Sequence, residues 1–274
     1  MDDLLDVEKD AGKSFTRFLR NQRNTYIERL KAAPVLPTSV LVEARTLRSI
    51  QREDKPEPPH AFEVWVNSYI LTDSPQQLEM WVEEGRDWMQ NAAILAGTET
   101  LLELAVDVVF NQRDTKLLRW LSERSRRSAQ LIQGATDEDV LMNLWDVVYE
   151  GHFSINKATA ALQESFAFSK GRAERIARTE ILSAGRAGQF HGDRQSGIVI
   201  GKKWMAAQNE RTRRGHREAD GQVVAFDEPF YVANGSGQLE PLMFPSDSSL
   251  GASASNVIQC RCWYKRILEG EELE

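Results

Sequence analysis

The hydrophobic pattern of this chain changes at Gly197, and this change limits its fold class more than any other feature. Before Gly197, apolar residues recur every three or four positions among charged residues, which is typical of amphipathic helices. After it, the segments GIVIGKKWMAA and NVIQCRCWYKRIL alternate and are rich in β-branched and aromatic residues, as strands are. The sequence therefore predicts an α+β protein, with a mainly α-helical N-terminal body that includes a long basic helix, and then a small mixed α/β C-terminal module.

Proline and glycine positions divide the chain into five expected parts. Prolines in the stretch KPEPP favour an extended spacer between helices. The parts are an N-terminal helical segment (1–53), a proline-rich linker (54–60), a helical body (61–168), the C-terminal module with the basic helix (169–268) and an acidic tail (269–274). Short breaks that contain Gly97, Asn111, Gly134 and Gly151 predict separate helices over residues 98–110, 115–132, 137–149 and 154–166.

The basic helix is expected from about Ser169 to Arg194, with a seam of small apolar residues on one face. These residues are Ala173, Ile176, Ala177, Ile181, Ala184 and Ala187. Small side chains let a neighbouring helix approach closely, so we expect this seam to be a packing surface.

Charge is spread unevenly along the chain. The net charge of −7 argues against a protein that coats nucleic acid along its whole length. The stretch 170–217 nevertheless holds twelve Lys/Arg and only four Asp/Glu, which suggests a local contact with phosphate or with an acidic partner. The candidate contact residues are Lys170, Arg172, Arg175, Lys202, Lys203 and Arg214. A solvated helix face is the alternative explanation of the same charges.

Targeting and redox features indicate a protein that assembles in a reducing cytosol. No run of 18 apolar residues is present, and the acidic N-terminus does not resemble a secretory signal, so neither membrane contact nor secretion is expected. Two cysteines cannot form a disulfide framework.

Cys260 and Cys262 are the only cysteines, and they lie in a segment that is expected to be a strand (257–265). On a strand they would share one apolar face with Ile258 and Tyr264, and burial as small core residues would explain them. A disulfide between them is disfavoured by geometry. A zinc site with His216 and a reactive thiol are the alternatives that remain open.

His216 has two possible roles. Beside Glu210 and Asp220 it could act as a general base, whereas in a buried polar network it would hold loops in place. The network is favoured because no nucleophile is evident and no GxxxxGK[ST], GxGxxG, HExxH or GxSxG motif occurs. In that network we expect Arg211 and Arg213 to pair with carboxylates such as Glu180 or Asp220.

Six short segments, taken in order, resemble a known family. They are RIARTE (175–180), SGIVIGKKW (196–204), NERTRRGHREADGQ (209–222), DEPF (227–230), MFPSD (243–247) and GASASNVIQCRC (251–262). Together they resemble the phage head morphogenesis family, the Mu F-like minor head proteins. The chain departs from the family pattern at Asn209, Ser246 and Gln259, where the family has Asp, Gly and Asn. The loss of the Asp weakens a catalytic or metal role for position 209.

The resemblance implies a minor capsid protein of a tailed bacteriophage that binds the portal vertex during procapsid assembly. Its implied place is the virion, at the head interior or portal vertex, and the host cytoplasm during assembly. The implied partner is the portal protein, with the major capsid protein, a scaffolding protein and double-stranded DNA as further candidates. A structural protein without a cofactor is expected, rather than an enzyme.

The residues expected to form the structural network are Arg178, Glu180, Arg211, Thr212, Arg213, His216, Asp220, Gly221, Cys260, Arg261 and Cys262. Two alternatives use the same part of the chain. One is a metal- or histidine-dependent nuclease or hydrolase that combines His216 with nearby carboxylates, and the other is a plain DNA-binding protein.

Overall fold

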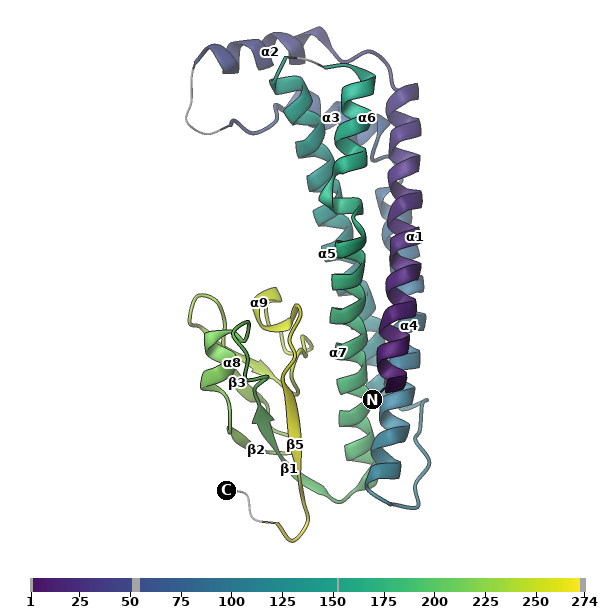
Figure 1. Ribbon diagram of the computed structural model, residues 1–274, viewed down its shortest axis with the longest axis vertical. Coiled ribbons are helices and arrows are strands. Elements are labelled where there is room, and N and C mark those ends of the chain that lie inside the picture. The colour runs from purple at the N-terminus through teal and green to yellow at the C-terminus, as the bar shows by residue number, and fades with distance from the viewer. Residues whose placement is uncertain (1, 51–54, 152, 272–274) are drawn as a thin grey trace. The chain divides into compact units, whose positions relative to one another are not determined.

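The computed structural model describes residues 2–50, 55–151 and 153–271, and its long helices precede its strands in the chain (Figure 1). The helical elements before the first strand are α1 (Asp2–Ala32), α2 (Thr38–Ser49), α3 (His60–Tyr69), α4 (Ser74–Glu103), α5 (Thr115–Tyr149), α6 (Ile155–Glu164), the 3₁₀ helix η1 (Phe166–Phe168) and α7 (Lys170–Ser196). The C-terminal elements are β1 (Val199–Met205), α8 (Arg214–Glu218), β2 (Val223–Ala225), β3 (Phe230–Ala233), β4 (Leu239–Leu242), α9 (Ala254–Val257) and β5 (Trp263–Leu268). The predicted α+β class and the long basic helix are confirmed.

The chain forms two compact units, and neither is one continuous stretch of sequence. Unit 1 takes Met1–Gly12, Val82–Ser128 and Arg175–Glu274, and unit 2 takes Lys13–Trp81 and Ala129–Glu174. Four long helices, α1, α4, α5 and α7, therefore contribute residues to both units. The predicted division into five parts stays a prediction, and positions 51–54 and 272–274, which include the start of the linker and the end of the acidic tail, lie outside the described residues.

Unit 2 is a helical unit with an aromatic core. The rings of Phe15 and Trp81 meet edge to face with centroids 5.3 Å apart, and those of Phe62 and Trp145 lie 5.4 Å apart. The indole N–H of Trp145 donates to the carbonyl of Pro56 at 2.9 Å, so the proline-rich stretch is tied to this core. Large indole rings thus fill the spaces between the helices of this unit.

In unit 1, α7 lies very close to a neighbouring helix. Ala177, Ile181, Ala184 and Ala187 of the predicted seam are all buried. A Cβ atom added to Gly188 would lie 2.1 Å from the carbonyl oxygen of Ala93 in α4. Glycine at position 188 is therefore what allows the two helix backbones to approach each other here.

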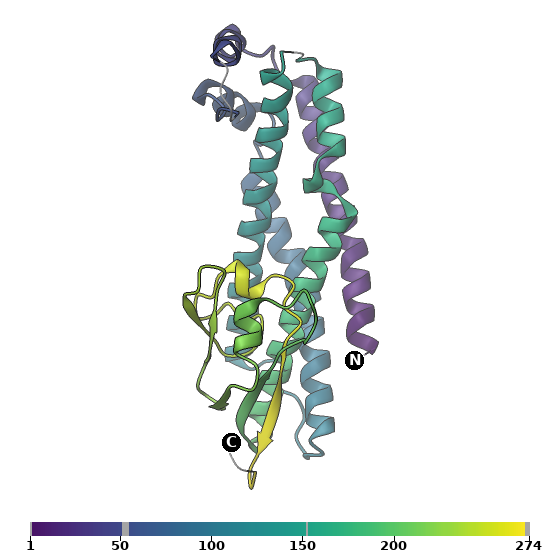
Figure 2. The same ribbon diagram turned by 60° about the vertical axis from the view of Figure 1, so that its left-hand side comes forward.

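Unit 1 also contains two small antiparallel sheets, which the two views of Figures 1 and 2 show together with α8 and α9. In the first sheet β1 lies between β2 and β5, and Trp204 of β1 pairs with Tyr264 of β5. The second sheet is the hairpin of β3 and β4, whose turn contains Gly237 with a φ of 86°. The helices α8 and α9 and the loops beside these strands carry the candidate site.

The predicted helix breaks at Gly97 and Gly134 are wrong. One helix, α4, runs through Gly97 and ends at Glu103, and α5 runs through Gly134 without a break. At Gly97 a Cβ atom would lie 2.3 Å from the ring of Phe110, so this glycine serves packing instead of ending the helix. At Gly134 the well-packed turns on either side outweigh the modest helix propensity penalty of one glycine.

Candidate functional site

Two loops of unit 1 border a groove of about 510 Å³. One is the loop that precedes α8, and the other joins α9 to β5. Three arginines line the groove, namely Arg211, Arg213 and Arg261, together with His216 and both cysteines. The groove therefore combines cationic side chains with soft sulfur and imidazole ligands.

His216 is positioned by the short helix α8. A Cβ atom on the preceding residue, Gly215, would lie 2.0 Å from the carbonyl oxygen of Ala233, so only glycine lets α8 pack this closely against β3. The imidazole is 1% exposed and meets the indole of Trp204 edge to face, with ring centroids 5.6 Å apart. The ring is thus held in one place by the packing around it.

Cys260 and Cys262 are buried, as expected, but they do not lie on a strand. The strand β5 begins at Trp263, and α9 ends at Val257. Between them Gln259 has a φ of 53°, and the N–H of Cys260 donates to the carbonyl of Val257, so the backbone turns where an extended segment was predicted. This turn brings both thiols to the same side of the loop, toward α8.

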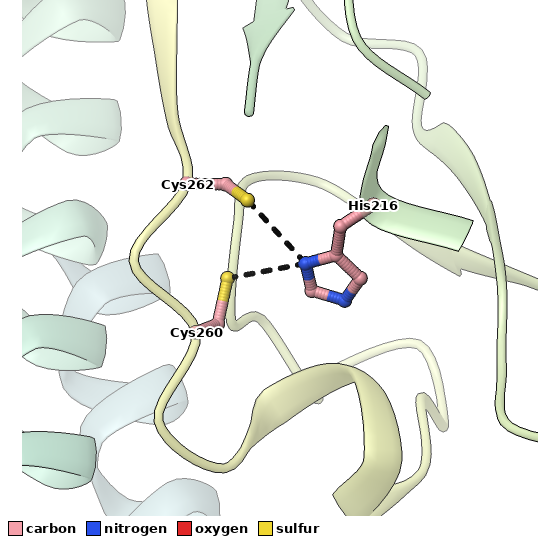
Figure 3. A group of neighbouring side chains, drawn as sticks. All are labelled: His216, Cys260 and Cys262. Atoms are coloured by element: carbon pink, nitrogen blue, oxygen red, sulfur yellow. Dashed lines mark hydrogen bonds between the residues drawn. The ribbon is translucent and has the colours of Figure 1, made fainter. Parts of the chain in front are cut away.

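The two sulfur atoms converge on one nitrogen of His216, as Figure 3 shows. The Nδ1 atom lies 3.4 Å from Sγ of Cys262 and 3.7 Å from Sγ of Cys260. All three ligand atoms lie within 4.8 Å of one another, and all three residues are buried. This three-residue cluster, His216, Cys260 and Cys262, is called the His–Cys–Cys cluster below.

The other ring nitrogen of His216 is held by Asn256. Nε2 lies 3.1 Å from Oδ1 of Asn256, while Nδ2 of the same amide donates to the carbonyl of Val232 and to a carboxylate oxygen of Glu240. Because the amide nitrogen donates to these acceptors, the amide oxygen faces the imidazole and must accept a hydrogen bond from Nε2–H. Nδ1 is therefore the nitrogen that carries a lone pair in the neutral ring, and it points at the sulfurs.

The two thiols differ in acidity because they interact with each other. A hydrogen bond from Cys262 holds the pKa of Cys260 well below its usual range, and His216 and the guanidinium of Arg186 act in the same direction. The same bond, together with burial, raises the pKa of Cys262. Cys260 is thus the thiol that ionises first.

The predicted arginine–carboxylate pairs of the network are different from those in the structure. Arg213 donates to the carbonyl of Ile258 and not to Glu180 or Asp220. Asp220 accepts from the N–H of Ala206 and from Gln208. The groups gathered with His216 are two thiols and an amide, whereas the hydrolase alternative paired this histidine with carboxylates.

Glu180 is instead the partner of Arg124 from α5. Two parallel hydrogen bonds, of 2.7 and 3.0 Å, join the guanidinium to the carboxylate, and both side chains are buried. Arg124 also donates to the hydroxyl of Ser248. Arg178, another predicted member of the network, pairs with Glu8 of α1. The remaining predicted members lie near the groove: Thr212 accepts from Asn209, and the N–H of Gly221, with a φ of 80°, donates to Trp204.

Two of the predicted contact residues for nucleic acid or a partner are wrong, because they are buried. Lys202 is 0% exposed and donates to the carbonyl of Phe226 at 2.7 Å. Arg172 donates to the carbonyls of Ala167 and Ile132. The donor groups of both side chains therefore make internal hydrogen bonds. Lys170, Arg175 and Arg214 are exposed and Lys203 is half-buried, and their contact role stays a prediction.

Arg124, Arg186 and Asn256 were not among the site residues predicted from the sequence. Arg186 donates to the carbonyl of Cys260 at 3.0 Å, which places a positive charge beside the cluster. Asn256 lies in the motif segment GASASN, and Arg186 lies on the predicted basic helix. Both are therefore within residues 175–262, the part of the chain that resembles the family. Arg124 lies outside it, and nothing in the local sequence marks it.

Comparison with known proteins identifies the family. Residues 138–265 match the model of the family described as Phage Mu protein F like protein. This match covers just under half of the chain. The match includes all of α7, the groove and the His–Cys–Cys cluster. The predicted resemblance to the phage head morphogenesis family is thereby confirmed.

Three curated proteins are similar to this chain over part of their lengths. "Uncharacterized protein YqbB" of Bacillus subtilis (strain 168) is 29% identical over 61% of this chain. "Minor head protein GP7" of Bacillus phage SPP1 is 31% identical over 38% of it. "NAD(+)--arginine ADP-ribosyltransferase EFV" of Enterococcus faecalis (strain ATCC 700802 / V583) is 32% identical over 48% of it. The matches span 53%, 32% and 26% of these relatives, in that order.

No solved structure matches this chain. Within the described residues, none of the helices combines the length and the apolar character that a membrane span requires.

Proposed function

We propose that this protein is a minor component of a tailed-phage head that binds the portal vertex while the procapsid assembles. The observation that carries the proposal is the Mu F-like match over residues 138–265. The similarity to a phage minor head protein supports it. The virion is accordingly its proposed final place, after assembly in the host cytoplasm.

A structural role fits the groove better than catalysis does. A general base needs a proton-accepting atom that faces a substrate, but Nδ1 of His216 faces two thiols and Nε2 faces Asn256. The similarity to an ADP-ribosyltransferase covers 26% of that protein. We therefore assign the His–Cys–Cys cluster to holding the C-terminal module together.

The helix α2 is the proposed contact with the portal. Large apolar side chains are exposed along it and beside it: Val35 (93%), Leu41 (41%), Val42 (59%) and Ile50 (53%). Exposed apolar side chains that gather on one segment are typical of surfaces that bind another protein. Packaged double-stranded DNA is the proposed second partner, through exposed arginines such as Arg211 and Arg214.

Co-sedimentation with the portal protein of the same phage tests this proposal. The wild-type chain is expected to sediment with assembled portal rings. The double variant Leu41→Asp/Val42→Asp is expected to lose at least about ten-fold in affinity, because two charges would have to be buried in an apolar contact.

Ser39→Asp is the control, because it places one carboxylate at an exposed position near the N-terminus of the same helix, where an acid is tolerated. It is expected to bind as the wild type does. Wild-type protein that stays in the supernatant would refute portal binding. Undiminished binding of the double variant would refute only the assignment to α2.

A further inference from the structure

We propose that the His–Cys–Cys cluster is a zinc site, with Nδ1 of His216 and the sulfurs of Cys260 and Cys262 as its protein ligands. This inference goes beyond the role in head assembly and does not depend on it. It is based on the distances between the ligand atoms, on the hydrogen bonds that orient them and on the chemistry of the donor set.

The distances fit ligands that share one tetrahedral ion. With a Zn–S bond of about 2.3 Å and a Zn–N bond of about 2.0 Å, a nitrogen and a sulfur around the same ion lie roughly 3.6 Å apart. Nδ1 of His216 lies 3.4 and 3.7 Å from the two sulfurs. A single lone pair can accept one well-directed S–H bond, so a hydrogen bond accounts for one of these contacts and a shared ion accounts for both.

Outer groups orient the imidazole as they do at metal sites. Asn256 accepts from Nε2 of His216, and Asn256 itself donates to a carboxylate oxygen of Glu240 at 2.9 Å. A ligating histidine usually donates its other ring N–H to such an acceptor, which fixes the tautomer and the direction of the free lone pair. Here that lone pair points at the two sulfurs.

The surroundings of the sulfurs suit thiolates. The backbone N–H of Ala207 is hydrogen-bonded to Sγ of Cys262, and Arg186 brings a guanidinium to the loop that carries both cysteines. Negative charge on the sulfurs is therefore met by donors and by a cation inside the fold. Metal binding needs this deprotonated form.

The donor set selects the metal. Two thiolates and one imidazole favour zinc over the hard cations Mg²⁺ and Ca²⁺, which take oxygen ligands. All three residues also line the 510 Å³ groove, so the fourth ligand can come from that side, as a water molecule or as a donor from a bound partner. Such an ion would connect α8 directly to the loop before β5.

Metal analysis of the full chain tests the proposal. Tag-free protein expressed with added zinc and purified without chelator is expected to hold about one zinc ion per chain by elemental analysis. Substitution of Co²⁺ is expected to give sulfur-to-cobalt charge-transfer absorption together with the visible bands of a tetrahedral site. The chain has only two cysteines, so this charge-transfer signal can only come from the cluster.

Cys262→Ser and His216→Ala are expected to lose the zinc, whereas the control His60→Ala, which changes a histidine whose side chain is 88% exposed, is expected to keep it. If the cluster variants do not fold, the zinc content and the cobalt absorption of the wild-type chain still test the proposal. Zinc far below one ion per chain after incubation with equimolar Zn²⁺, without the cobalt–thiolate absorption, would overturn the proposal.

Discussion

Arg124→Met is expected to lower the free energy of unfolding by about 3 to 5 kcal/mol, because it leaves the buried carboxylate of Glu180 without its partner. The two side chains are 6% and 9% exposed and meet through two parallel hydrogen bonds. Methionine keeps most of the volume of arginine, so the loss comes from the uncompensated charge. Urea unfolding, followed by circular dichroism, measures the effect.

Two further variants separate the charge effect from other causes. In the double variant Arg124→Met/Glu180→Met an apolar pair replaces the ion pair, and much of the lost stability is expected to return. Arg214→Met removes a solvent-exposed arginine paired with Glu218 and is expected to leave the stability nearly unchanged, because exposed ion pairs contribute little. A loss in Arg124→Met no larger than in Arg214→Met would show that the buried pair contributes little.

The difference in free energy of unfolding between the wild-type protein and Lys202→Met is expected to change with pH. Between about pH 7 and pH 10 it should rise in favour of the wild type by roughly 3 to 5 kcal/mol. Burial lowers the pKa of Lys202 to about 7. In this pH range the unfolded chain holds a proton that the folded chain lacks, so raising the pH favours the folded state. Below about pH 7 both states are protonated and the difference levels off.

The surroundings of Lys202 explain the choice of methionine. The amine lies 4.9, 5.5 and 5.4 Å from the ring centroids of Phe190, Phe226 and Phe230, where a linear apolar side chain can be accommodated. The charged groups that influence it are Asp227, Arg194, Asp247 and Glu228. Urea unfolding at a series of pH values gives the profile. Lys265→Met, at an exposed position of β5, controls for the loss of one lysine charge. Identical pH profiles for Lys202→Met and Lys265→Met would contradict the expectation.

The sequence was sufficient for elements that depend on local pattern. The basic helix followed from a repeating seam whose members Ala177, Ala184 and Ala187 are buried in the structure. The helix breaks predicted at Gly97 and Gly134 were wrong. A glycine ends a helix only where packing neither needs the missing side chain nor stabilises the helix on both sides of it.

The candidate site depended on geometry that local patterns do not contain. The turn at Gln259, with a positive φ at a residue other than glycine, has no sequence signal, yet it places Cys260 beside His216, 44 residues earlier in the chain. The zinc alternative therefore named three residues that the structure brings together, while the strand assigned to the two cysteines was wrong. Arg124 and Glu180 lie 56 residues apart in the chain. Charge alone could not show that Arg124 is the partner of Glu180, since Arg211 and Arg213 carry the same charge.

The interleaved chain path of unit 1 has a consequence for protein synthesis. Its first residues are made early, but Glu8 pairs with Arg178, 170 positions later, and the site needs residues up to Cys262. Contacts between segments so far apart in sequence cannot form until most of the chain has left the ribosome. The other unit needs nothing beyond residue 174, so it has the earlier opportunity to fold. Expressing the family-matched stretch 138–265 alone would separate its residues 175–265 from the other segments of unit 1, including Arg124.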